Sequence, residues 1–456
     1  MVEHPDPWSW RQELAEQLGP LLTAGGGRTG AARRPQDAGE ARPEAGTASL
    51  LSALGGRLAE DLRAPEDVPA LPVSAMDGFA VRAADVDPAG PTVLPVLADI
   101  PAAPGGARRL SPGTAARIMT GAPVPTGADA VIEVERTDAA RAGAAPAKVR
   151  IGPVPQLRPG RHVRRPGEEI PRGAVIAPAR QEVTPGLVAV AAMLGLGRLP
   201  LAPGLPSRTR ADGPRVAVLV TGDEVLPGHD IAAGQADGAV RDSNGVMLAA
   251  ALAELGARAL PRRCSDAPAP FLRSLREAAE EADLVLTTGG IGHGAFDVVK
   301  AVLGEGGTGG SRFAHLALRP GGPQGRGTLA RADGSLAPLV HLPGTPVGAL
   351  VGFHLFVRPL LGAGEITQGV LGPIPEAARP QPGRRGSGGA AQTRLHALPA
   401  VLEEHDDAGH GAPRALLLPG RRLAPFARAD ALVLLELAPG QEAEEGAAVP
   451  VVRLGA

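Results

Sequence analysis

A carboxylate in a turn is the first group in this sequence that could do chemistry. Residues 72–81 read PVSAMDGFAV, so Asp77 sits in a glycine-containing turn before the apolar start of a strand. Because Asp-Gly is first of all a turn signal, a purely structural role is the plain alternative for this residue. A carboxylate displayed on such a turn can be reached by a ligand, which makes Asp77 a candidate for binding a metal ion or a reacting oxyanion.

Polar loops that follow apolar strands supply a second set of candidates. Residues 221–225, TGDEV, come directly after the apolar run RVAVLV and carry Glu224. Farther on, Asp242, Ser243 and Asn244 stand immediately before a stretch of helical character. Each of these three is a good helix N-cap that needs no further role, and the alternative is that exposed N–H groups at the helix start hold an anion.

Two glycine-containing loops extend this set. Residues 289–294, GGIGHG, follow the strand-like run DLVLTT, and their glycines would let the backbone approach a ligand such as a phosphate closely. Such loops also occur in many unrelated folds. His293 is an acid/base or ligand candidate with a surface residue as its ordinary alternative, and Lys300 on the next helix is either functional or simply solvated. Residues 342–346, LPGTP, begin another helix whatever they bind, with Pro346 at the first helical position.

These loops need a scaffold, and the pattern beyond residue 212 predicts one. Continuous apolar strands alternate with helices across residues 212–363, which favours a parallel sheet covered on both faces. In such sheets ligands bind at the carboxyl ends of the strands, where TGDE, TTGG and LPGT fall. The predicted fold class is therefore α/β multidomain, with this parallel-sheet domain as its ligand-binding part.

The rest of the chain divides into shorter pieces. Helices are expected over residues 9–22 and 50–62. Residues 92–154 are rich in β-branched residues, proline and glycine with frequent turns, as in a small β domain. The predicted divisions are a flexible N-terminal segment at 1–48, a first domain at 49–91 and 155–211, a β domain at 92–154, the α/β domain at 212–363 and a small β-barrel-like domain at 364–456.

Composition argues against several classes of protein. The chain has 456 residues, a formal net charge of -2 and one cysteine, Cys264, so an intramolecular disulfide is excluded. Scattered arginine pairs without interleaved aromatic residues argue against a nucleic-acid-binding surface. No run approaches the roughly 20 apolar residues that span a bilayer, and the first residues do not resemble a signal peptide. We expect a cytoplasmic protein without membrane or nucleic-acid partners.

Six motifs taken together resemble the molybdopterin molybdenumtransferase family, known as MoeA in bacteria and as the E domain of gephyrin in animals. They are PVSAMDGFAV, RIMTGAPVPTGADAV, RRPGEEI, VAVLVTGDEVLPG, DLVLTTGGIGHGAFDVVK and LPGTPVGAL, and the resemblance covers roughly residues 48–456. It implies an elongated first domain with an inserted β domain, a molybdopterin-binding α/β domain, and a homodimer in which the β domain of one subunit covers the α/β domain of the other. The implied reaction is insertion of molybdate into adenylated molybdopterin with release of AMP, assisted by Mg²⁺.

The resemblance also assigns roles to individual residues. The implied catalytic residues are Asp77, Thr120, Glu169, Glu224 and Asp297, and the implied metal ligands are Asp77, Glu224 and Asp242. The implied cofactor-binding residues are Thr221, Gly222, Asp242, Ser243, Asp266, Gly289, Gly290, Gly292, Lys300, His315, Arg319, Pro343, Gly344 and Pro346. A small molecule is the expected substrate, with molybdoenzymes or other proteins of the cofactor pathway as further partners.

Several positions depart from the family's pattern. His315, Arg319 and Gly322 stand where the family often has lysine, and Thr345 and Gly348 replace its Asn and Ser. Arg319 keeps a charge that can pair with phosphate, whereas His315 is largely neutral near pH 7 and Gly322 has no side chain. These losses motivate one alternative, a paralogue that binds the cofactor as a carrier without efficient metal insertion. A gephyrin-like scaffold for another protein is the second alternative.

Overall fold

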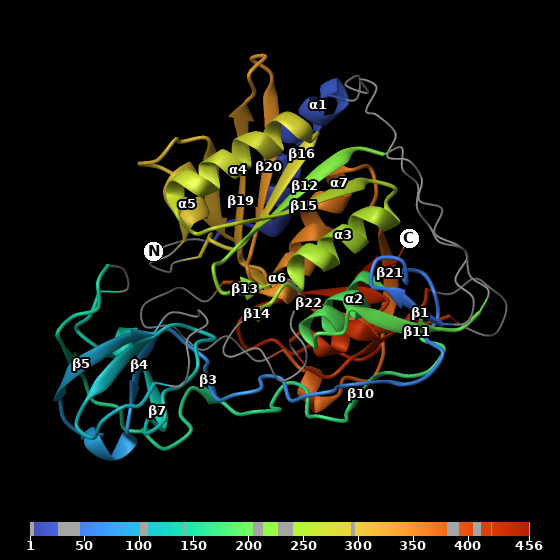
Figure 1. Ribbon diagram of the computed structural model, residues 1–456. Coiled ribbons are helices and arrows are strands. Elements are labelled where there is room, and N and C mark those ends of the chain that lie inside the picture. Colours follow the sequence, from blue (N-terminus) through green and yellow to red (C-terminus); the bar gives the residue numbers. More distant parts are fainter. Residues whose placement is uncertain are drawn as a thin grey trace.

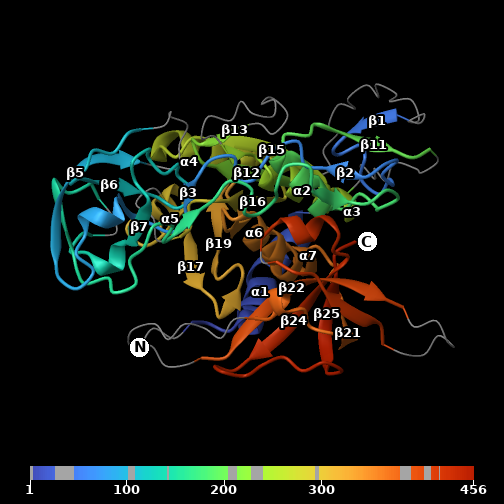
Figure 2. The same cartoon turned by 90° about the horizontal axis from the view of Figure 1, so that it is seen from below.

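Three large sheets organise the part of the chain that the structure describes. The computed structural model describes residues 4–25, 46–100, 108–140, 143–203, 213–226, 240–292, 297–380, 392–404, 412–420 and 422–455. One sheet is flanked by helices, one closes into a barrel, and a five-stranded sheet projects at one end of the molecule (Figure 1). Seen from below, the five-stranded sheet and the barrel lie well apart (Figure 2). The prediction of an α/β multidomain fold is confirmed.

The helix-flanked sheet has the strand order β15-β12-β16-β20-β19-β17. Its strands are β12 (Arg215–Thr221), β15 (Arg258–Cys264), β16 (Leu284–Thr288), β17 (Ser311–His315), β19 (Pro323–Ala330) and β20 (Leu336–Leu342). Its helices are α3 (Asn244–Glu254), α4 (Pro268–Glu281), α5 (Val298–Leu303), α6 (Pro346–Gly352) and α7 (Arg358–Leu360), with a π-helical segment at Phe353–Val357 between the last two.

Both faces of this sheet are buried, which explains the continuous apolar runs in the sequence. Val216 and Val218 of β12 share a core with residues of α3 and α6, whereas Ala217 and Leu219 share a second core with residues of α4 and α5. Successive side chains of a strand point to opposite faces, so every apolar residue of β12 has a helix to pack against.

The sheet is mixed, whereas the sequence predicted a parallel one. The strands β15, β12, β16 and β20 are parallel, but β19 is antiparallel to β20 and β17 is antiparallel to β19. The connections at residues 316–322 and 331–335 are too short for a crossover, so they can only join antiparallel neighbours. The strand β15 was not predicted because its sequence, RALPRRC, is polar, as suits a half-exposed edge strand.

The N-terminal helix corrects the prediction of a flexible segment at 1–48. Helix α1 (Pro7–Gly25) contacts β20 and α7, and the side chains of Trp10, Leu14 and Leu18 are buried in the main core. These three residues recur at every fourth position and therefore form one apolar face. The segment is held by that face, so the prediction of flexibility is wrong for residues 7–25. Residues 26–45 lie outside the described part of the chain.

The helix expected at 50–62 does not form. Instead β1 (Gly46–Ser49) pairs with β11 (Arg198–Leu201), and β2 (Leu62–Arg63) pairs with β10 (Val175–Ala177). Between them Gly55 has a φ of 75°, a left-handed conformation that ends a helix and that glycine adopts without strain. Helix α2 (Pro185–Met193) follows in the same region.

The five-stranded sheet has the order β7-β4-β6-β5-β8. Its strands are β4 (Gly78–Val81), β5 (Thr92–Ile100), β6 (Ala115–Ile118), β7 (Ala130–Glu133) and β8 (Lys148–Ile151). The strand β4 lies between β6 and β7, so the predicted start of this domain at residue 92 is wrong: the sheet includes residues 78–81. A short ribbon of β3 (Val73–Ser74) and β9 (Val163–Arg164) leads into it.

The C-terminal strands close into a barrel. The strands are β21 (Ile366–Leu371), β22 (Arg394–Glu403), β23 (Arg414–Leu417), β24 (Ala431–Leu437) and β25 (Ala448–Arg453), and pairing of β22 with β24 closes the ring. The short strand β18 (Leu318–Arg319) adds to β22 from the α/β region. Among the described residues, no helix combines the length and the apolar character that a membrane crossing requires.

Candidate active site

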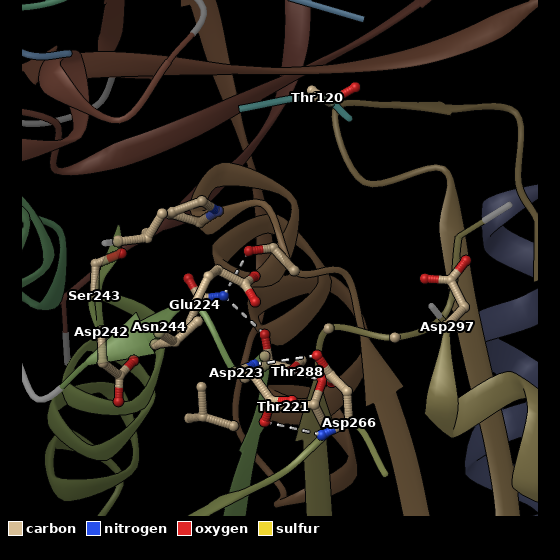
Figure 3. Close-up of a pocket in the computed structure, with 18 of the residues that line it drawn as sticks. Thr120, Thr221, Asp223, Glu224, Asp242, Ser243, Asn244, Asp266, Thr288 and Asp297 are labelled. Carbon is tan, nitrogen blue, oxygen red and sulfur yellow. Dashed lines mark hydrogen bonds between the residues drawn. The ribbon is translucent and has the colours of Figure 1, made fainter. Parts of the chain in front are cut away.

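A cavity of about 500 Å³ lies where the carboxyl ends of the parallel strands meet the five-stranded sheet. Its walls come from the loops after β12 and β16, the starts of α3 and α6, and the turns before β4 and after β6. The lining residues are Asp77, Met119, Thr120, Val220, Thr221, Gly222, Asp223, Glu224, Val225, Val240, Arg241, Asp242, Ser243, Asn244, Asp266, Thr288, Gly289, Gly290, Asp297, Gly344 and Pro346. Figure 3 draws most of these residues and labels ten of them.

The five-stranded sheet contributes Asp77 and Thr120 as a hydrogen-bonded pair. The strands β4 and β6 are antiparallel with Gly78 opposite Ile118, so the residues just beyond this pair come together at the end of the ladder. The Oδ1 atom of Asp77 accepts from the backbone N–H and from the hydroxyl of Thr120, each at 2.7 Å. These bonds hold the carboxylate in one orientation while it faces the cavity.

Glycines bring the loops after β12 and β16 into contact. Gly289 has a φ of 96°, and a Cβ atom there would lie 2.6 Å from the Oγ1 atom of Thr221. Only glycine therefore fits at this point. The Oγ1 atom of Thr221 also donates to the carbonyl of Thr288 at 3.2 Å, which fixes the two strand ends to each other.

A buried network behind these loops joins three of them. The Nδ2 atom of Asn244 donates to the Oγ1 atom of Thr288 and to the carbonyl of Gly344, each at 2.8 Å. The hydroxyl of Thr288 in turn donates to the carbonyl of Pro343 at 2.9 Å. The Oδ1 atom of Asn244 is buried and has no protein partner among the described residues, so it can accept a hydrogen bond from a ligand.

The cavity is strongly acidic. Burial raises the pKa of Glu224, and the charges of Asp266 and Asp223 raise this pKa further, against the effect of a backbone hydrogen bond. Burial also raises the pKa values of Asp242 and Asp266. Each of these carboxyl groups therefore holds a proton more readily than an exposed one, which suits proton transfer or the binding of a cation.

One cation accompanies these acids on the described lining. Arg241 is buried, its guanidinium pairs with Glu66, and it donates to the carbonyl of Met193 at 3.2 Å. Its charge is thus partly compensated from behind the cavity. A phosphate-bearing ligand would rely on this cation and on the backbone N–H groups at the start of α3 and in the glycine loops.

The described residues do not form a ready site for Mg²⁺. No group of three or more His, Cys, Asp or Glu side chains in the described ranges could hold a metal ion. Of the predicted ligands, Asp77 is held by Thr120, and the Oδ1 atom of Asp242 accepts from the backbone N–H of Gly245 at 2.7 Å. The structure therefore gives no support to the predicted metal site.

Some predicted site residues lie away from this cavity. Glu169 accepts from Arg164 at 2.9 Å and from the backbone N–H of Leu423 at 3.2 Å, so it fixes its own loop to the C-terminal region. Arg319 faces a separate cavity of about 200 Å³ beside the barrel. Lys300 lines another cavity and donates to the carbonyl of Gly292 at 3.4 Å.

The substituted lysine positions are also absent from the lining. The carbonyl of His315 is bound by the ring of His4 at 2.9 Å, and a Cβ atom on Gly322 would lie 2.6 Å from the His315 ring. Pro343 directly precedes the lining residue Gly344, and a Cβ atom on Gly292 would lie 3.3 Å from the Oδ2 atom of Asp297, but neither Gly292 nor Pro343 is on the lining. His293 lies outside the described residues.

Sequence reasoning missed several lining residues. Asp223 stands beside Glu224 in the TGDE loop, and Thr288 is the last residue of β16, so their positions after strands were a usable signal. Arg241 directly precedes the Asp242 motif, and Met119 directly precedes Thr120. Nothing in the local sequence marks Asn244 as the centre of a network, because its partners are 44 and 100 residues away.

The fold and the cavity define a class: a multidomain α/β protein that holds its ligand at the carboxyl ends of parallel strands, beneath a turn from a separate β sheet. Residues 29–195 match the model of the MoeA N-terminal region (domain I and II), and residues 217–363 match that of a probable molybdopterin binding domain. The chain is 42% identical over 324 residues to molybdopterin molybdenumtransferase 2 of Mycobacterium tuberculosis, which covers 69% of this chain and 74% of that relative.

A second relative agrees with the first. The molybdopterin molybdenumtransferase of Bacillus subtilis is 34% identical over 308 residues, which is 67% of each chain. The chain therefore belongs to the molybdopterin molybdenumtransferase family. A molybdopterin biosynthesis MoeA crystal structure from Pyrococcus horikoshii is 25% identical, covers 91% of this chain and 95% of its own, and overlays with a TM-score of 0.39. The assignment to the family rests on the sequence relatives and not on this overlay.

Proposed function

We propose that this protein is a transferase of molybdenum cofactor biosynthesis that inserts molybdate into adenylated molybdopterin and releases AMP. The observation that carries the proposal is that Asp77 and Thr120 line the same cavity as the loops after β12 and β16. The strand-end loops come from the region that matches a probable molybdopterin binding domain, and the turns come from the MoeA N-terminal region. Two parts of the family's sequence therefore meet at one hollow.

The cavity offers groups for each part of such a ligand. The unpaired Oδ1 atom of Asn244 can accept from an N–H or O–H group of the pterin. The N–H groups at the start of α3 and the glycines at 289 and 290 suit phosphate oxygens. Arg241 supplies positive charge on the same lining.

The carboxyl groups with raised pKa values are the candidates for proton transfer in this reaction. Release of AMP requires water to add to a phosphorus atom, and a nearby base must take a proton from that water. Glu224 suits this role because burial and its acidic neighbours raise its pKa. Thr120 holds Asp77 on the wall opposite the strand ends. There the carboxylate of Asp77 can orient the oxyanion, molybdate, by accepting a hydrogen bond from a protonated oxygen of molybdate or from a water molecule between the two.

The predicted Mg²⁺ enters no step of this proposal. Mg²⁺ commonly binds one or two carboxylates together with substrate phosphates, so the ligand itself would have to complete its coordination. The homodimer and the protein partners implied by the family also stay predictions. Within one chain the Asp77 turn faces the strand-end loops across this cavity.

The carrier alternative loses the observation that motivated it. It rested on the missing lysines at His315 and Gly322, but neither residue lines this cavity. Their substitution therefore does not remove a cation from the proposed site.

The test is to incubate the protein with adenylated molybdopterin and to measure AMP with and without molybdate. The proposal expects AMP release to depend on molybdate. Tight binding without molybdate-dependent release would favour the carrier instead.

A further inference from the structure

A second and larger cavity, of about 690 Å³, lies away from the Asp77 turn. It is lined by residues of α1, α5 and the antiparallel strands β17 and β19, and Gln17 and Leu18 of α1 form part of its wall. None of the residues on its described lining also lines the cavity at Asp77. It is therefore a separate candidate site.

Three cations line this second cavity: Lys300, Arg312 and Arg326. Arg326 is only 2% exposed, its guanidinium stacks 4.7 Å from the ring centre of Trp10, and its Nε and Nη1 atoms have no hydrogen-bond partner among the described residues. A buried guanidinium with two unmet donors is unfavourable unless an acceptor reaches it.

Acidic groups compensate these cations only in part. Glu13 of α1 pairs with Arg326 and, at 3.0 Å, with Arg312, and Glu305 lies on the lining. Three cations against these two carboxylates leave one positive charge in excess. The net charge of the described residues around this cavity therefore favours an anion.

A fixed hydroxyl adds a neutral hydrogen-bonding group. The Oγ atom of Ser311 lies 2.9 Å from the Nε2 atom of His341, whose Nδ1 atom lies 2.9 Å from the Oγ1 atom of Thr287. Burial lowers the pKa of His341 to about 3, so its ring is neutral and is a weak base. Ser311 is thus held in place as a hydrogen-bonding group, and His341 does not activate it as a nucleophile.

We propose that this second cavity binds a tetrahedral oxyanion of the phosphate class, either as a free ion or as the terminal phosphate of a nucleotide. Guanidinium groups, an ammonium and a hydroxyl are the donors that such an anion needs. The proposal concerns a site separate from the proposed transferase cavity and does not depend on that activity.

The chain carries its own reporter for this binding. Its two tryptophans, Trp8 and Trp10, both lie on α1, and Trp10 stacks against the arginines of the cavity. In the full-length Trp8→Phe variant, the remaining fluorescence comes from Trp10. We expect inorganic phosphate, added at constant ionic strength, to change this emission in a saturable way, with calorimetry on the same protein as a second readout.

Arg312→Gln tests the assignment because Arg312 is exposed, so its replacement should not unfold the protein. It should raise the dissociation constant for phosphate by about tenfold or more, as expected for loss of a charge-assisted hydrogen bond. The control is Arg379→Gln, which removes a similarly exposed arginine that pairs with Glu442, away from this cavity.

Competition by AMP separates the two sources of the anion. Displacement of phosphate by AMP identifies a nucleotide phosphate, and failure of AMP to compete identifies the free ion; both agree with the proposal. Absence of saturable phosphate binding by both methods, or equal binding in the Arg312→Gln and Arg379→Gln variants, would overturn it.

Discussion

The Nδ2 atom of Asn244 donates to the Oγ1 atom of Thr288 at 2.8 Å, and this bond fixes the start of α3 to the end of β16. Thr288 continues the connection to the carbonyl of Pro343, just before α6. The three loops that form the strand-end wall of the cavity are therefore set by one buried network. A substitution that breaks this network should therefore weaken ligand binding, although it changes no charged group.

Replacing Thr288 with valine should weaken both folding and ligand binding. Valine keeps the shape but makes neither hydrogen bond, so the free energy of unfolding should fall by about 1–3 kcal/mol. Thr287→Val is the matched control, because its hydroxyl contacts His341 and not the loops of the cavity. Urea denaturation and calorimetry with adenylated molybdopterin measure the two effects. Equal affinity in the two variants would show that the network does not shape the site.

Replacing Gly289 with alanine should be more damaging than a typical glycine substitution. A Cβ atom at Gly289 would meet the Oγ1 atom of Thr221 at 2.6 Å, in addition to the strain of a φ of 96°. Gly440 has a φ of 82° with no atom near its Cβ position, so Gly440→Ala has the strain alone, about 1 kcal/mol. Chemical denaturation should show a larger loss for Gly289→Ala, together with loss of ligand affinity. Similar losses in both variants would contradict the contact.

Removing the charge of Asp242 should stabilise the protein at neutral pH. Burial raises the pKa of Asp242 in the folded state, so the folded protein binds this proton more tightly than the unfolded chain does. Stability is therefore lost as pH rises through the folded pKa, and Asp242→Asn should unfold at higher urea than wild type near pH 7. The difference should vanish below the unfolded pKa of about 4. A stabilisation that does not depend on pH would exclude this cause.

Helix α1 should contribute strongly to stability. The side chain of Trp10 is 2% exposed, so Trp10→Ala should lower the free energy of unfolding by about 3–5 kcal/mol. Trp8 is only partly buried, and Trp8→Ala provides a comparison of the same chemistry on the same helix. If both variants lost the same small amount, α1 would not be packed into the core in solution.

The sequence identified what depends on local pattern. Loops after β12 and β16, and the helix starts at Asn244 and Pro346, follow from apolar runs that end in polar or glycine-rich residues. The joining of Asp77 to Thr120 depends on the pairing of strands 43 residues apart, which no local pattern shows. The burial of α1 was missed for a similar reason, because the amphipathic pattern did not reveal which surface its apolar face would meet.

The roles of His315 and Arg319, which stand where the family often has lysine, were predicted from the family's pattern and not from geometry. His315 lies at the end of β17, the edge strand at the far side of the sheet from β12. Arg319 lies on β18, which pairs with β22 in the barrel sheet. The sequence could not place them because the antiparallel edge of the sheet was not predicted. The positions of His315 and Arg319 in the sequence did not indicate that these residues would lie away from the cavity.

The most direct test of the proposed site is molybdate-dependent AMP release by the Asp77→Asn variant compared with Asp333→Asn. Both residues are turn aspartates whose Oδ1 atom accepts from a backbone N–H and a hydroxyl, Asp77 from Thr120 and Asp333 from Ser335. Asparagine preserves the accepting oxygen in each case, so circular dichroism should show both variants folded. We predict that Asp77→Asn loses release by a factor of about 100 or more, as for removal of a group that acts in the transition state, while Asp333→Asn keeps it. Wild-type rates in the Asp77→Asn variant would contradict the assignment of this cavity as the active site.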